Sequence, residues 1–154
     1  MPVILLHTRI HAPIEVVFDL CRSVDAHMAS TGKSNEVAIA GVTSGLMELG
    51  DTVTWRATHL GVRQTLTSRI TRFDRPHMFR DSMVRGAFKR IDHDHLFRSE
   101  DGVTVAEDRF DFDAPLGPLG WLANRLFLTR KMRLFLSERM AAIKVMAESG
   151  AHEV

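Results

Sequence analysis

Residues 88–114 read FKRIDHDHLFRSEDGVTVAEDRFDFDA, and this segment is the most informative about the fold. Apolar and polar side chains alternate through residues 88–99 and 103–113, and Asp101-Gly102 lies between these two runs. Asp-Gly favours the two-residue turn of a β-hairpin, because both central residues of that turn need positive φ. The sequence therefore predicts a hairpin with three diagnostic pairs: His93 with Phe110, His95 with Asp108, and Phe97 with Ala106.

The predicted register decides which side chains share a face, because successive residues of a strand point to opposite sides. One face carries aromatic residues together with two histidines and an aspartate: His93, His95, Phe97, Ala106, Asp108, Phe110 and Phe112. The other face is charged and is expected to face water: Arg98, Glu107, Arg109, Asp111 and Asp113. Polar groups on an inner face cost stability unless they are paired or used. The inner face therefore holds the candidates for a function.

The composition is typical of a globular protein, with 154 residues, 45% hydrophobic and 25% charged, and a formal net charge of +1. We expect residues 1–154 to form one domain, and the charge gives no argument for a nucleic-acid partner. The lone cysteine, Cys21, excludes an internal disulfide and suits a reducing compartment. We see neither a secretory signal nor an apolar run long enough to cross a bilayer, so we expect a cytoplasmic protein.

Helices are predicted near both ends of the chain. Residues 3–10 alternate weakly as a strand, and Pro13 fits the first turn of a helix whose apolar spacing buries Cys21. Ser23 can cap a second short helix. After residues 114–120, a long helical pattern has an apolar stripe, with charged residues including Arg125, Lys131, Arg133 and Arg139 predicted mostly elsewhere. The stripe consists of Leu119, Leu122, Leu126, Met132, Leu136, Met140 and Ile143.

Residues 36–113 keep a period near two and predict six antiparallel strands. A turn at Leu60-Gly61 would pair Trp55 with Leu66 and Val53 with Ser68. The turn at residues 73–76 would then give three further pairs: Ile70 with Phe79, Ser68 with Asp81, and Leu66 with Met83. We predict an α+β fold in which a curved antiparallel sheet of about seven strands wraps around the long C-terminal helix, with two short helices after the first strand.

Five motifs resemble the START-like superfamily, also called SRPBCC or helix-grip, and in particular a bacterial ligand-binding branch. They are IHAPIEVVFDL at 10–20, GDTVTW at 50–55, FRDSM at 79–83, His93-x-His95-x-Phe97, and APLGPLG at 114–120. The resemblance covers essentially the whole chain. It implies a deep cavity between sheet and helix that holds a small hydrophobic ligand, such as a lipid or polyketide. It implies no single reaction, because the superfamily includes carriers, sensors, polyketide cyclases and hydrolases.

A cluster of polar residues on the predicted inner faces admits several interpretations: His59, Ser68, Asp81, His93, His95 and Asp108. It can orient a ligand at one wall of an apolar cavity, or it can be a satisfied buried network that only fixes strand register. A His95–Asp108 pair could instead catalyse a cyclase, dehydratase or hydrolase reaction as a general base. His-x-His with Asp81 and Asp108 also offers nitrogen and oxygen ligands for zinc or iron, but this spacing is a weak signal, so we predict no metal or cofactor.

We predict that Asp81, His93, His95 and Asp108 form the polar end of the cavity. Its apolar walls are predicted to include Trp55, Leu66, Phe79, Phe97, Phe110 and Met132. A further hypothesis is an interaction module that uses the basic residues of the long helix: Arg125, Arg130, Lys131 and Arg133. Such a run is also typical of a solvated helix face. A protein partner or a homodimer is compatible with the sequence.

Overall fold

The computed structural model describes residues 3–32, 34–59, 61–114 and 118–150, without the side chains of His59 and residues 118–125. Within these ranges, a seven-stranded antiparallel sheet has the order β1-β7-β6-β5-β4-β3-β2. Its strands are β1 (Val3–Ile10), β2 (Val37–Gly41), β3 (Thr52–His59), β4 (Val62–Asp74), β5 (Met78–Arg85), β6 (Arg90–Glu100) and β7 (Val103–Asp113).

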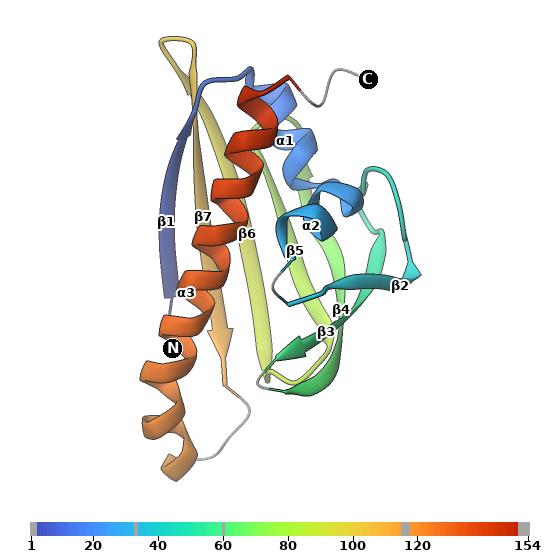
Figure 1. Ribbon diagram of the computed structural model, residues 1–154, viewed down its shortest axis with the longest axis vertical. Coiled ribbons are helices and arrows are strands. Elements are labelled where there is room, and N and C mark those ends of the chain that lie inside the picture. Colours follow the sequence, from blue (N-terminus) through green and yellow to red (C-terminus); the bar gives the residue numbers. More distant parts are fainter. Residues whose placement is uncertain (1–2, 33, 60, 115–117, 151–154) are drawn as a thin grey trace.

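The helices of the described residues, three in number, lie on one face of this curved sheet (Figure 1). Two short ones, α1 (Ile14–Cys21) and α2 (Val24–Ser30), follow β1, and the long α3 (Pro118–Glu148) follows β7. In Figure 1, α3 runs along the sheet, and α1 and α2 lie beside its C-terminal half. This arrangement confirms the predicted α+β helix-grip fold.

The β6–β7 hairpin has the predicted register. His95 pairs with Asp108 and His93 with Phe110, and the turn residues Asp101 and Gly102 have φ values of 50° and 81°. Along β6, the burial alternates strictly from Arg90 to Phe97. The hairpin therefore directs both histidines into the interior.

The register between β3 and β4 is also as predicted, with Trp55 opposite Leu66. The predicted β4–β5 register is wrong, because Ser68 pairs with Met83 and Ile70 with Asp81. The turn is later than expected, since β4 continues to Asp74, and the register shifts again between Ile70 and Arg72. A displacement of two residues keeps each side chain on its face. Ser68 and Asp81 therefore still point inward, as predicted, although the predicted register is wrong.

The packing of α1 is built on Phe18, which is fully buried. Its ring meets Phe73, Phe79 and Phe97 edge to face, with centroids 5.3 to 5.4 Å apart. Cys21 is buried on the same helix, as predicted, and burial raises the pKa of its thiol to about 12. This cysteine is therefore a packing residue with an unreactive thiol at neutral pH.

Helix α3 departs from its predicted pattern at two positions. Leu136, Met140 and Ile143 are buried as expected, but Leu126 is 78% exposed. The N-terminal part of α3 extends past the end of β1, where the sheet no longer covers it (Figure 1). Arg139, predicted to lie mostly away from the apolar stripe, is buried. No helix in the described ranges combines the length and the apolar character needed to span a membrane.

Replacement of Phe18 by alanine should lower the free energy of unfolding by about 3–5 kcal/mol, because it leaves a cavity among three aromatic rings. The control Leu126→Ala removes an exposed side chain and should change stability by less than about 0.5 kcal/mol. Urea denaturation measures both values. Equal effects of the two substitutions would contradict this account of the core.

Candidate functional site

A cavity of about 250 Å³ lies between the sheet and α3. Most of its wall is apolar, from residues that include Val53, Trp55, Ala57, Leu66, Ile70, Phe79, Phe88, Ile91, Phe110, Leu128, Met132, Phe135 and Leu136. Polar side chains also reach it, among them Arg22, His27, Glu36, Ser68, Asp81, His93, His95, Lys131 and Arg139. An apolar space with a few polar groups is the usual form of a small-molecule site.

Most of the residues predicted for the site line this cavity: Trp55, Leu66, Phe79, Asp81, His93, His95, Phe110 and Met132. Two others lie behind its wall. Phe97 packs against Phe18, and Asp108 hydrogen-bonds to the far side of the histidine pair. The side chain of His59 is outside the described residues.

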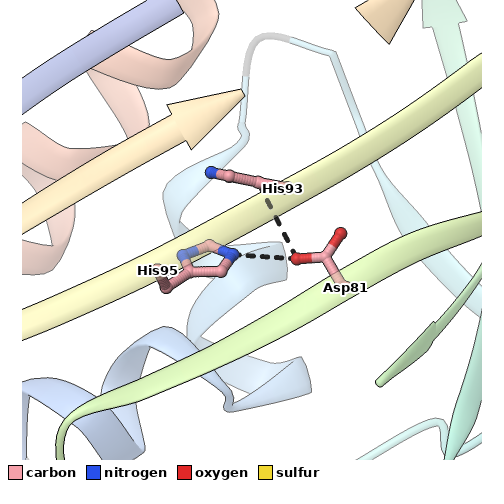
Figure 2. Close-up of side chains that lie close together, drawn as sticks. All are labelled: Asp81, His93 and His95. Atoms are coloured by element: carbon pink, nitrogen blue, oxygen red, sulfur yellow. Dashed lines mark hydrogen bonds and ion pairs between the residues drawn. The ribbon is translucent and has the colours of Figure 1, made fainter. Parts of the chain in front are cut away.

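Asp81, His93 and His95 come together at one wall of the cavity, where β5 pairs with β6 (Figure 2). His95 Nε2 lies 2.8 Å from Asp81 Oδ2, and His93 Nδ1 lies 3.7 Å from the same oxygen. The two imidazole centroids are 3.8 Å apart. The side chain of Asp81 is 26% exposed, while both imidazoles are almost fully buried. Asp81 is therefore the member of the cluster with the most surface open to the cavity.

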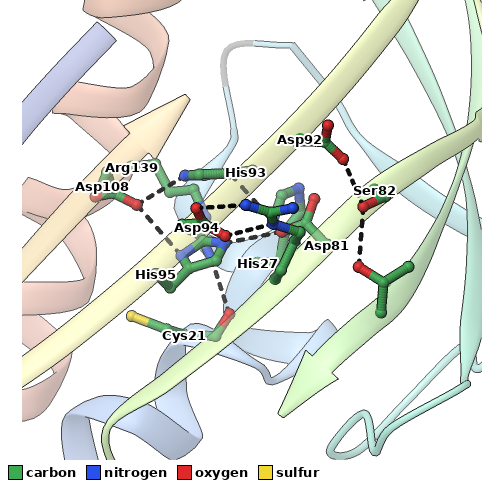
Figure 3. A network of polar contacts seen from close by, with 12 residues as sticks. Cys21, His27, Asp81, Ser82, Asp92, His93, Asp94, His95, Asp108 and Arg139 are labelled. Atoms are coloured by element: carbon green, nitrogen blue, oxygen red, sulfur yellow. Dashed lines mark hydrogen bonds and ion pairs between the residues drawn. The ribbon is translucent and has the colours of Figure 1, made fainter. Parts of the chain in front are cut away.

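Asp108 contacts the same two histidines from the opposite side (Figure 3). Its Oδ1 lies 2.8 Å from His93 Nε2 and 3.2 Å from His95 Nδ1. Among the described residues, its Oδ2 has no hydrogen-bond partner. The predicted His95–Asp108 pair is brought to 3.2 Å, yet the hydrogen bonds join His93 to Asp108 and His95 to Asp81.

The charges of this cluster follow from burial and mutual contact. Burial alone would raise the pKa of Asp81 and of Asp108, but the hydrogen bonds and charges of the histidines lower both pKa values below the usual range. Burial likewise opposes protonation of His95, yet its two carboxylate neighbours raise its pKa. Burial and repulsion by His95 lower the pKa of His93 despite its bond to Asp108. The two adjacent imidazoles therefore have pKa values shifted in opposite directions, upward for His95 and downward for His93.

Sequence reasoning missed Arg139, which reaches the cavity from α3. Its Nη2 donates to the carbonyl oxygen of Cys21 at 2.9 Å, and its Nε has no partner among the described residues (Figure 3). Its charge contributes to the lowered pKa of Asp81. The signal was present, because Arg139 follows Leu136 by three positions and precedes Ile143 by four, which is the spacing of the buried stripe.

A second missed group lies where α1 and α2 meet the sheet. Arg22 is buried and donates to Asp19 Oδ1, Glu48 Oε1 and the Met47 carbonyl. His27 stacks on Trp55 with ring centroids 4.2 Å apart. The burial of Arg22 was not predicted, because two of its partners, Met47 and Glu48, come from a loop whose path the sequence does not specify.

The predicted basic string on α3 does not form one surface. Arg130 and Arg133 are exposed, and Arg133 Nη1 lies 3.5 Å from the carbonyl oxygen of Leu5. Lys131 instead turns toward the cavity and is partly buried. The side chain of Arg125 is outside the described residues.

Solved structures with similar folds come from bacteria and plants. TTHA0849 from Thermus thermophilus has a TM-score of 0.79 and 15% identity, covering 97% of this chain and 99% of that chain. A START superfamily protein from Mycobacterium smegmatis has a TM-score of 0.72 and 9% identity, with 96% and 97% coverage. Ginseng major latex-like protein 151 from Panax ginseng has a TM-score of 0.66 and 15% identity, with 95% and 97% coverage.

At these identities the likeness shows the fold alone, and one of these neighbours is itself a START superfamily protein. No family model matches the sequence, and a search of curated proteins finds no match. These comparisons therefore assign no ligand to this chain.

The two histidines should differ in protonation in the ligand-free protein. We expect ¹⁵N NMR to show that the His95 imidazole stays protonated at pH values above its usual pKa of about 6.5, because carboxylates flank it. The His93 imidazole should already be neutral at pH values below about 6.5. Asp81→Asn removes one of the flanking charges and should lower the pKa of His95. If the two imidazoles titrated together near pH 6.5, the opposite pKa shifts of His95 and His93 would be contradicted.

Proposed function

We propose that this protein binds a small, mostly apolar molecule in the cavity between the sheet and α3. The observation that carries the proposal is the cavity itself, with aromatic and aliphatic walls and one polar end at Asp81, His93 and His95. Helix-grip proteins of the START-like type typically bind hydrophobic ligands, which agrees with this assignment.

The size of the cavity favours a compact ligand. Pockets for drug-sized molecules have volumes of roughly 300–1,000 Å³. At about 250 Å³, this cavity suits a small ring system or a short-chain lipid better than a long acyl chain. A compact polyketide-like molecule belongs to the same class.

The polar end favours a ligand that carries a hydroxyl group. Asp81 is the most accessible member of the cluster, and its carboxylate accepts hydrogen bonds. A ligand hydroxyl would donate to Asp81, while the apolar body of the ligand would contact residues such as Trp55 and Leu66. Ligand binding needs only this geometry, whereas the cyclase, dehydratase or hydrolase hypothesis also needs a substrate placed against His95.

A cavity-filling substitution tests the proposal. Leu66→Trp should weaken binding of an apolar fluorescent probe, 1-anilinonaphthalene-8-sulfonate, by about tenfold or more, because the indole would occupy the cavity. The control Val84→Trp adds the same side chain at an exposed position of β5 and should leave the affinity unchanged. A probe titration followed by fluorescence measures both affinities. Failure of the wild type to bind, or equal affinity in Leu66→Trp, would refute the proposal.

A further inference from the structure

The geometry points to a binding site for a divalent transition-metal ion formed by Asp81, His93 and His95 at the polar end of the cavity. The three side chains each offer one ligand atom, and these atoms all lie within 4.8 Å of one another. Imidazole nitrogen and carboxylate oxygen are ligands suited to zinc and to ferrous iron. The proposal departs from the sequence-based expectation of no metal, because the structure brings the carboxylate of Asp81 within 3.7 Å of a nitrogen of each histidine.

Two of the three separations between ligand atoms lie near the spacing expected around one ion, and the third is at most 4.8 Å. Ligands at about 2.0–2.2 Å from a tetrahedral ion lie about 3.3–3.6 Å from each other. Asp81 Oδ2 lies 2.8 Å from His95 Nε2 and 3.7 Å from His93 Nδ1, so the observed separations lie on either side of this range (Figure 2). Small side-chain rotations would equalise them.

The position of His93 also leaves room for an ion beside Asp81. His93 Nε2 lies 2.8 Å from the carboxylate of Asp108, and His93 Nδ1 lies 3.7 Å from Asp81 Oδ2. In the tautomer that donates its Nε2 proton to Asp108, Nδ1 presents a lone pair toward Asp81. Both atoms can then act as ligands of one ion between them.

Asp108 would act as the positioning residue of this site. Histidines that bind metals usually direct their other ring nitrogen to a carboxylate, which fixes the tautomer and the ring orientation. Asp108 Oδ1 accepts a hydrogen bond from His93 Nε2 at 2.8 Å and lies 3.2 Å from His95 Nδ1, so one buried carboxylate would orient His93 directly and contact both rings (Figure 3). In this account, the position of Asp108 behind the histidines explains its burial.

The proposed site would keep open positions toward the cavity. Three protein ligands leave room for water or a ligand oxygen on a zinc or iron ion. The cavity that borders Asp81, His93 and His95 supplies that room. Metal binding is measured with the ion alone, so this inference does not rest on the proposed apolar ligand.

The test is a titration of chelator-treated, full-length protein with Zn²⁺ by calorimetry, and with Co²⁺ by visible absorption. We expect one ion per chain, with Co²⁺ bands typical of nitrogen and oxygen ligation. Asp81→Ala and His93→Gln should each weaken binding at least tenfold, and Asp108→Asn by about 10–100-fold. His7→Gln is the control, because it alters an exposed histidine that pairs with Glu107 outside the cavity, and its affinity should not change.

Circular dichroism checks that each variant is folded. Asp81→Ala keeps the test decisive, because this side chain is partly exposed and its removal leaves the buried His93–Asp108 bond in place. Absence of stoichiometric Zn²⁺ binding in the wild type, or wild-type affinity in folded Asp81→Ala, would overturn the inference. Probe binding without Zn²⁺ binding would refute the metal site alone, and Zn²⁺ binding without probe binding would refute the apolar ligand alone.

Discussion

The burial of one carboxylate constrains the centre of this structure. Asp108 is 2% exposed, and a buried charge without a partner is strongly destabilising. His93 and His95 both contact its Oδ1 atom. These contacts require β6 and β7 to keep their register, because a slip of one residue would turn these side chains toward water. Asp81 extends the same charge pattern to β5. The cluster thus fixes how three adjacent strands are aligned.

The cavity follows from where this cluster lies. Aromatic and aliphatic residues fill the interior on either side of it, with Phe18, Phe79 and Phe97 in one group and Phe110 and Phe112 in another. Helix α3 covers the space between these groups and brings Arg139 to it. The result is a mostly apolar cavity with the Asp81, His93 and His95 cluster at one wall. Both the ligand proposal and the metal proposal start from that arrangement.

Strand register and the inward or outward direction of side chains could be predicted from the alternation of the sequence and from its turn residues. Asp101-Gly102 fixed the β6–β7 register, and the inward face of Asp81 was found despite a wrong β4–β5 register. The strand register predicts which residues are neighbours. It does not predict the side-chain rotamers, which decide which histidine hydrogen-bonds to which aspartate. Arg139 shares the spacing of the buried stripe, but its charge argues against burial. Its hydrogen bond to the Cys21 carbonyl, which helps to explain the burial, is known only from the structure.

Native mass spectrometry is the decisive test of a ligand-binding cavity. The protein would be incubated with a hydrophobic extract of bacterial cells, separated from unbound material, and its native mass compared with its denatured mass. We expect an added small organic mass that is lost on denaturation and is much reduced in Leu66→Trp. A native mass equal to that of the bare polypeptide, or an adduct equally abundant in both proteins, would contradict the existence of such a cavity.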